Sequence, residues 1–140
     1  KFNLRVANIK KTTNLLLENI FKAKQKIIGY GASTKGNIVL NHCNIKSKQI
    51  KYICDENPEK YGRYTPGTNI KIISKKNMRN IKPDYLLVLI WSFKTEVIKQ
   101  ELNYIKKGGK LIFHLPFLHI ADKENYHQHL NENFEAFSYK

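Results

Sequence analysis

The chain has 140 residues, the length of a single domain that can fold without disulfides or a structural metal. Its formal net charge is +14, but only Arg5, Arg63 and Arg79 are arginines and the lysines are spread along the chain. This distribution favours a solvated surface, or attraction of an anionic ligand, over a nucleic-acid site.

The longest apolar run, Tyr85–Trp91, is too short to span a membrane, and Lys1–Asn3 does not begin a signal peptide. Cys43 and Cys54 are isolated thiols outside any zinc-ligand pattern. We therefore expect a cytoplasmic protein that binds no metal, no membrane and no nucleic acid.

Helical and strand patterns alternate along the chain. In order, the sequence predicts a helix over 3–23, strands over 26–30 and 49–54 separated by a helix over 35–42, a polar loop over 55–69, a strand over 70–73, a helix over 74–80, a strand over 85–90, a helix between 92 and 108, and a last strand over 110–113. Ser74 and Ser92 are the expected N-caps of the last two helices. This order predicts an α/β fold, a Rossmann-like, doubly wound, mostly parallel sheet with flanking helices over residues 1–120, followed by a polar C-terminal tail over 121–140.

A glycine-rich turn joins the first strand to the next helix, in the sequence Gly29-Tyr-Gly-Ala-Ser-Thr-Lys-Gly-Asn37. Such a turn lets backbone N–H groups approach a phosphate. Gly29 and Gly31 match the first two glycines of the dinucleotide fingerprint, but Thr34 stands in place of the third. The turn therefore indicates a phosphorylated ligand, with tight packing of helix on strand as the alternative.

Two further observations bear on that ligand. Asp55 follows the second predicted strand, 24 positions after Gly31, close to the offset expected for a carboxylate that binds ribose, which keeps a nicotinamide cofactor open. Lys35, beside Ser33 and Thr34, suits a diphosphate through one charge and two hydroxyl donors.

Other polar or aromatic residues also follow predicted strands, where this architecture binds its ligands. Trp91 can stack on a base or a sugar, or anchor the edge of the core. His114 is the one histidine we consider as a proton shuttle, because it follows the last strand. His127 and His129 lack a carboxylate or thiol pattern and are expected at the surface.

Several ordered motifs together resemble a known family. They are the glycine turn, Asp55-Glu-Asn-Pro-Glu-Lys-Tyr-Gly62, Pro66-Gly-Thr68, Pro83-Asp-Tyr85 and Trp91-Ser-Phe-Lys94. Over residues 2–120 the chain resembles the C-terminal domain of SAM-dependent sugar C-methyltransferases, which act on nucleotide-linked 4-keto-deoxy sugars. The resemblance implies a Rossmann-like domain that holds the nucleotide-diphosphate sugar against a SAM-binding domain, in cis or as a separate subunit. It also places SAM and the catalytic base in that other domain, so this chain alone is not expected to transfer a methyl group.

The resemblance assigns roles to the candidate residues. Ser33, Thr34, Lys35 and Asn37 would contact the diphosphate or the sugar. Asp55 and Asn57 would bind ribose or organise the loop, and Lys60, Tyr64 and Thr68 would close it. For Asp55, Asn57 and Thr68 the alternative is a side chain that only stabilises a turn. Two other functions stay open, a nicotinamide-dependent oxidoreductase and a non-catalytic docking domain.

Overall fold

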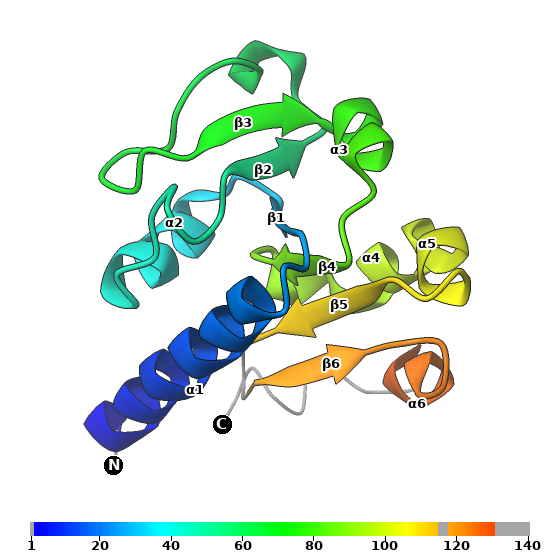
Figure 1. Ribbon diagram of the computed structural model, residues 1–140, viewed down its shortest axis with the longest axis horizontal. Helices are drawn as coiled ribbons and strands as arrows, with labels where there is room; N and C mark the ends of the chain where they lie inside the picture. The colour runs from blue at the N-terminus through cyan, green and yellow to red at the C-terminus, as the bar shows by residue number, and fades with distance from the viewer. Residues whose placement is uncertain (1, 115–117, 131–140) are drawn as a thin grey trace.

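The computed structural model describes the backbone of residues 2–114 and 118–130, and the side chains from residue 9 onward within those ranges. A single six-stranded sheet, in the order β3-β2-β1-β4-β5-β6, forms its centre (Figure 1). The strands are β1 (Ile27–Tyr30), β2 (Tyr52–Asp55), β3 (Lys71–Ser74), β4 (Tyr85–Val88), β5 (Lys110–Phe113) and β6 (His119–Ala121). The α-helices are α1 (Phe2–Lys22), α2 (Thr34–His42), α3 (Lys75–Ile81), α4 (Lys94–Gln100), α5 (Leu102–Lys106) and α6 (Tyr126–Leu130), with short 3-10 helices η1 (Pro58–Lys60) and η2 (Trp91–Phe93). The predicted fold class is confirmed.

Strand β1 lies in the middle of the sheet and pairs in parallel with β2 and β4. After β1 the chain moves outward to β2 and β3, then returns to place β4 on the other side of β1. The carboxyl ends of β1 and β4 therefore form the point where the strand order reverses, which is where open α/β sheets bind ligands.

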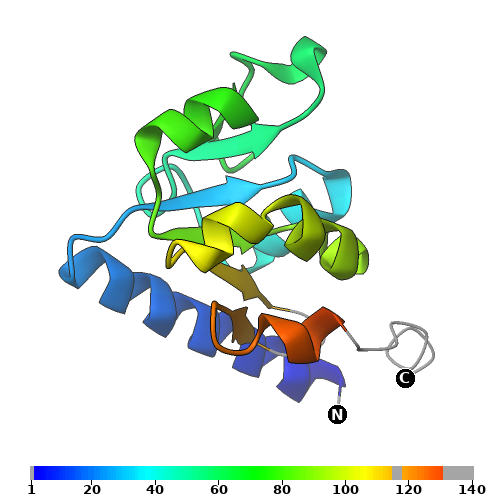
Figure 2. The same ribbon diagram turned by 90° about the vertical axis from the view of Figure 1, so that its right-hand side faces the viewer.

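Helices cover both faces of the sheet (Figure 2). Leu17 and Leu40 of α1 and α2 pack on one face with Leu87 and Leu89. On the other face, Leu86 and Val88 pack with residues of α3, α4 and α5. The apolar run of β4 alternates between two cores, as its sequence predicts for a strand covered on both sides.

Helix α1 runs antiparallel to the parallel strands of the sheet, as Figure 2 shows. Its first turns therefore lie towards the edge of the sheet where the parallel strands end, and its last turn lies where they begin. The N-terminal end of the described chain is on the same side as the strand-order reversal.

The predicted caps have different outcomes. Ser74 accepts a hydrogen bond from the Asn77 N–H at 3.1 Å and caps α3, as predicted. The prediction that Ser92 caps the next helix is wrong. Ser92 lies inside η2, where the Phe93 N–H donates to Ile90 O, so α4 begins only at Lys94 and has no side-chain cap. The single predicted helix is also divided at Glu101 into α4 and α5.

Strand β6 was absent from the sequence prediction, which ended the sheet at β5. It pairs antiparallel with β5, with Phe113 opposite His119 and Leu111 opposite Ala121. Ala121 is fully buried and Tyr126 of α6 packs in the same core. Because β6 spans only three residues, its alternation is too short to recognise in the sequence. The division at residue 120 stays a prediction, and residues 131–140 lie outside the described part of the chain.

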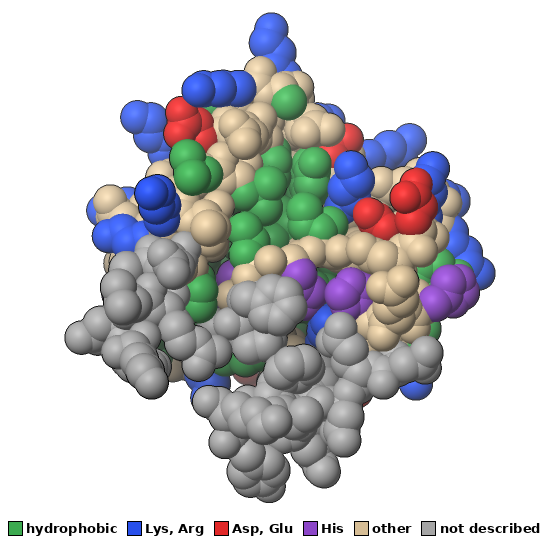
Figure 3. All heavy atoms as spheres, turned by 90° about the horizontal axis from the view of Figure 1, so that it is seen from below, with side chains coloured by type: hydrophobic (Ala, Val, Ile, Leu, Met, Phe, Trp, Pro, Cys, Tyr) green, Lys and Arg blue, Asp and Glu red, His purple; other side chains and the backbone are tan. Residues whose placement is uncertain are grey.

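Lysines gather where the parallel strands begin. Lys24 and Lys26 precede β1, Lys48 and Lys51 precede β2, and Lys106 and Lys107 precede β5. From below, Lys and Arg side chains stand around the margin of the molecule while hydrophobic side chains gather nearer its centre (Figure 3).

Within the described ranges, no helix is long and apolar enough to cross a membrane, and no group of three or more His, Cys, Asp or Glu side chains is placed to hold a metal ion.

Candidate ligand-binding cleft

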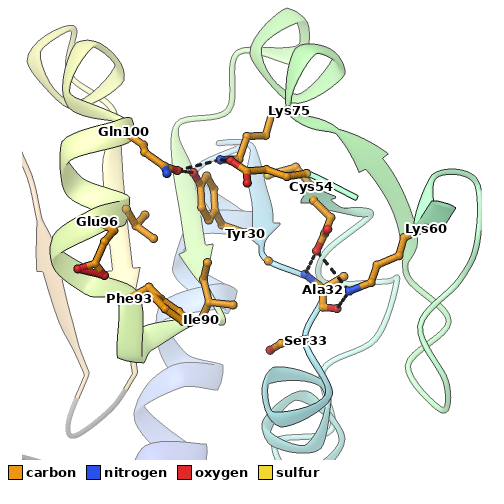
Figure 4. A pocket seen from close by; sticks show the side chains of 14 residues that line it. Tyr30, Ala32, Ser33, Cys54, Lys60, Lys75, Ile90, Phe93, Glu96 and Gln100 are labelled. Carbon is orange, nitrogen blue, oxygen red and sulfur yellow. Dashed lines mark hydrogen bonds and ion pairs between the residues drawn. The ribbon is translucent and has the colours of Figure 1, made fainter. Parts of the chain in front are cut away.

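A cleft of about 410 Å³ opens where β1, β2 and β4 end. One side, here called the loop wall, consists of Gly31, Ala32, Ser33, Asp55 and Lys60 (Figure 4). The other side, the helix wall, consists of Ile90, Phe93, Glu96, Val97 and Gln100. Tyr30 and Cys54 lie between the walls, with Glu56 and Lys75 completing the lining.

The structure brings four of the predicted site residues into the lining, Gly31, Ser33, Asp55 and Lys60. The remaining ones are not lining residues: Gly29, Thr34, Lys35, Asn37, Asn57, Tyr64, Thr68, Trp91 and His114. Thr34 and Lys35 are exposed at the start of α2, directly after the loop wall. Tyr64 is exposed and forms an isolated bridge with Lys71.

The two glycines at the end of β1 are required for packing. A Cβ at Gly29 would lie 2.7 Å from Ile53 Cγ1. Gly31 has a φ of +91°, and a Cβ there would lie 2.7 Å from Ile90 Cγ2 on the helix wall. The alternative of tight packing therefore accounts for both glycines, and Gly31 is the point where the two walls meet.

Most amides of the glycine turn already have protein acceptors. The N–H of Gly31 donates to Cys54 O at 2.8 Å, and that of Ser33 donates to Gly31 O at 3.0 Å. Ala32 donates its N–H to Asp55 Oδ2 at 2.8 Å. Ser33 Oγ accepts from the Gly36 N–H and caps α2. A phosphate bound at this turn would therefore meet the beginning of α2 rather than the amides of the turn itself.

Asp55 organises the loop wall. Its Oδ1 accepts from the Asn57 N–H at 2.9 Å, and its Oδ2 lies 3.7 Å from Lys60 Nζ. Lys60 Nζ also donates to Ala32 O at 2.9 Å. Asn57 in turn accepts from the Glu59 N–H and caps η1. These contacts favour the turn-stabilising alternative for Asp55 and Asn57, since both Asp55 oxygens are engaged within the protein.

Asn37 and Thr68 fasten the long loop to α2. Thr68, fully buried, donates from Oγ1 to Asn37 Oδ1 at 2.8 Å, and its hydroxyl also contacts that of Thr65. Asn37 Nδ2 donates to Pro66 O at 2.9 Å. The two side chains are therefore brought together, but by their own hydrogen bonds.

The helix wall was not predicted as part of the site. Phe93 has 55% of its surface exposed although it is a large aromatic residue, and it borders the cleft with Ile90 and Val97. Its sequence did contain a signal, because Phe93, Val97 and Gln100 follow at helical spacing. Of these three residues, only Val97 is buried.

A buried polar network lies behind the cleft. Tyr30 donates from its hydroxyl to Glu101 Oε2 at 2.8 Å, and Arg79 Nη2 donates to both Glu101 oxygens at 3.0 and 2.9 Å. Burial and the Glu101 carboxylate raise the pKa of Tyr30, and burial raises the pKa of Cys54 to about 12. Both groups therefore stay protonated at neutral pH and are unsuited to act as bases.

His114 directly follows β5 and is not among the residues that line the cleft. It is 1% exposed, its ring centroid is 6.0 Å from that of Trp91, and neither ring nitrogen has a hydrogen-bond partner within the described ranges. Burial, with a smaller effect of His119, lowers the pKa of His114 to about 4. His114 is therefore neutral at pH 7. Its role as a proton shuttle stays a prediction.

The strand order, the cleft at the reversal point and the glycine turn define a Rossmann-like α/β domain with a candidate ligand-binding cleft. The chain matches the family described as C-methyltransferase C-terminal domain over residues 1–116, and it belongs to that family. It is also 30% identical over 110 residues to the C-methyltransferase NovU of Streptomyces niveus. That match covers 79% of this chain but 26% of the relative, so the chain spans about a quarter of the length of that protein.

Proposed function

We propose that this domain binds the nucleotide-activated deoxy sugar that a SAM-dependent C-methyltransferase methylates next to a keto group. The observation that carries the proposal is the cleft at the carboxyl ends of β1, β2 and β4, in a member of a C-methyltransferase family. The resemblance described above suggests the ligand class, and the cleft is the part of the domain that we propose for it.

The lining has two kinds of surface that suit such a ligand. Ile90, Phe93 and Val97 provide apolar and aromatic surface against which a base or a sugar ring can pack. Ser33, Lys60 and Lys75 provide a hydroxyl and two ammonium groups for phosphates. A cleft of about 410 Å³ lies within the range of small-molecule sites.

The methyl-transfer chemistry belongs to another domain in this proposal. Tyr30 and Cys54 are held protonated, and the Glu101 carboxylate is fully engaged by Tyr30 and Arg79. SAM does not fit the loop wall well, because the Asp55 carboxylate that would meet its ribose hydroxyls is already bonded to Ala32, Asn57 and Lys60. In Figure 2 the N-terminal end of α1 lies on the side where the parallel strands end, and the cleft opens at those ends, so a domain joined ahead of α1 would meet the molecule on that side.

Calorimetric titration of the chain with nucleoside diphosphates and nucleotide sugars tests the proposal. We expect Lys35→Ala to weaken diphosphate binding by about 1.5–3 kcal/mol if its ammonium contacts the ligand at the start of α2. Lys48→Ala, an exposed lysine on the opposite edge, is the matched control and should leave the affinity unchanged. Unchanged affinity in Lys35→Ala would remove Lys35 from the site.

Absence of heat with every nucleotide, in protein shown to be folded by circular dichroism, would contradict the proposal and favour a docking domain. The oxidoreductase alternative predicts a change in the fluorescence of a reduced nicotinamide cofactor on binding. The engaged state of Asp55 argues against that alternative, since its oxygens are the expected ribose acceptors.

A further inference from the structure

Lys75 is the lysine most deeply placed at the cleft, and sequence reasoning gave it no role. It is the first residue of α3, directly after β3, and lines the cleft near Tyr30 and Gln100 (Figure 4). Its side chain is 19% exposed, whereas that of Lys60 is 39% exposed. An ammonium group with little water around it interacts more strongly with an anion than an exposed one does.

Three groups surround the Lys75 ammonium. Gln100 Oε1 accepts from Nζ at 3.1 Å, and the Tyr30 ring centroid lies 4.7 Å away. These neutral partners come from the helix wall and from the strand between the two walls, and they fix the position of the charge. Gln100 Oε1 also accepts from the Tyr30 hydroxyl at 3.3 Å, so the three side chains form one connected unit.

The third partner is an anion that is itself easy to move. Glu56 Oε1 lies 2.6 Å from Lys75 Nζ, yet the Glu56 side chain is 68% exposed. Glu56 belongs to the loop directly after β2, and the described residues give its carboxylate no second partner. An ion pair with so exposed a partner contributes little stability. A phosphoryl oxygen offers Lys75 the same kind of acceptor with more negative charge.

We propose that Lys75 is the phosphate-binding lysine of this cleft, and that Glu56 is a built-in competitor whose carboxylate the phosphoryl group replaces. This inference rests on the proposed function and makes it more specific, because it names the group that meets the ligand's diphosphate. Lys60 is less suited to that task, because it bridges Ala32 O and Asp55 within the loop wall.

If the phosphoryl group replaces the Glu56 carboxylate, removing the Glu56 charge should raise the affinity for phosphates only while Lys75 is present. Glu56→Gln should raise the affinity for inorganic pyrophosphate, and for any nucleoside diphosphate that binds, by about two- to fivefold. Lys75→Met should lower it at least about tenfold. Glu59→Gln, an exposed acid on the neighbouring η1, removes the same charge and measures the general effect of net charge.

The decisive measurement is a double-mutant cycle on the full chain, by calorimetry at low salt, with each variant checked by circular dichroism. In the Lys75→Met background, Glu56→Gln should give no more gain than Glu59→Gln does. Equal gains in affinity from Glu56→Gln and Glu59→Gln in the wild-type background would overturn the proposed exchange of the Glu56 carboxylate for a phosphoryl group. A full gain from Glu56→Gln without Lys75 would overturn it as well.

The two ligands separate this inference from the proposed function. A Lys75-dependent gain with pyrophosphate, together with no binding of any nucleotide sugar, would support the exchange and contradict the proposed function. Nucleotide-sugar binding that is unchanged by substitution of Lys75 or Glu56 would support the proposed function and contradict the exchange. Folded protein that binds neither ligand would contradict both.

Discussion

The two walls of the cleft are built in different ways. The loop wall is held by many short polar contacts, from Asp55 to the Ala32 and Asn57 amides and from Lys60 to Ala32 O. The helix wall presents Ile90, Phe93 and Val97 to the cleft and is held from behind by packing and by the Glu101 network. The comparison teaches that polar residues close to a site can be fully used in shaping it, while an exposed apolar surface remains available to a ligand.

The contact between the walls should give the largest effect. Gly31→Val combines a φ of +91° with a Cβ that would lie 2.7 Å from Ile90 Cγ2. We expect a loss of about 4 kcal/mol in the free energy of unfolding, measured by urea denaturation. Gly62→Val is the matched control, because Gly62 has a φ of +82° but nothing within 4 Å of its Cβ position. Equal losses in the two variants would show that the Gly31–Ile90 contact does not constrain the walls.

The next effect is a dependence of stability on pH that comes from the buried side chain of His114. His114 has a pKa of about 4 in the folded protein against 6.5 for an ordinary histidine. Between these values the unfolded chain binds a proton that the folded protein does not, so stability falls as the pH is lowered from 6.5 to 4. The expected loss is about 3 kcal/mol.

Urea denaturation of wild type and His114→Gln across that pH range measures this loss. The variant should lose stability much less steeply than wild type, whereas His127→Gln, at an exposed position of α6, should follow wild type. Parallel profiles for wild type and His114→Gln would contradict the assignment of a neutral buried imidazole.

The smallest effect concerns the hydrogen bond that holds the long loop to α2. Thr68→Val removes a buried hydroxyl bonded to Asn37 and Thr65, and should cost about 1–2 kcal/mol of unfolding free energy. Thr13→Val is the matched control in α1, because Thr13 Oγ1 is buried without a hydrogen-bond partner in the described ranges. That control should be neutral or slightly stabilising. A cost that is the same at both positions would indicate that the Asn37–Thr68 bond contributes nothing to the loop.

The fold was predictable because its signals are local and repeated. Val88 and Leu89 lie in a long apolar run, which is typical of a strand covered on both faces. The polar loop at 55–69 separates two clear strands. The three residues of β6 carry no such repetition, and Ser92 has the composition of a cap that η2 prevents it from forming.

The site was predictable in position but only partly in composition. Gly31, Ser33, Asp55 and Lys60 are adjacent in sequence to strand ends, so topology alone brings them to the cleft. Lys75 and Gln100 are brought to it because α3 and α4 pack in one core with β1 and β2, which depends on long-range contacts. The sequence also does not reveal that the side chains of Asp55, Asn37 and Thr68 already form hydrogen bonds within the protein, because those bonds exist only once the loop has folded.

The lysines where the parallel strands begin have a consequence for how charge acts in this domain. The cleft lining holds three carboxylates, Asp55, Glu56 and Glu96, and two ammonium groups, Lys60 and Lys75, so its formal charge is −1 although the chain as a whole is strongly positive. Ions in physiological solution screen exposed charges over about 8 Å. The excess of +14 therefore acts on the general approach of anions to the surface, whereas in our proposal recognition within the cleft depends on which of its few charges can change partners.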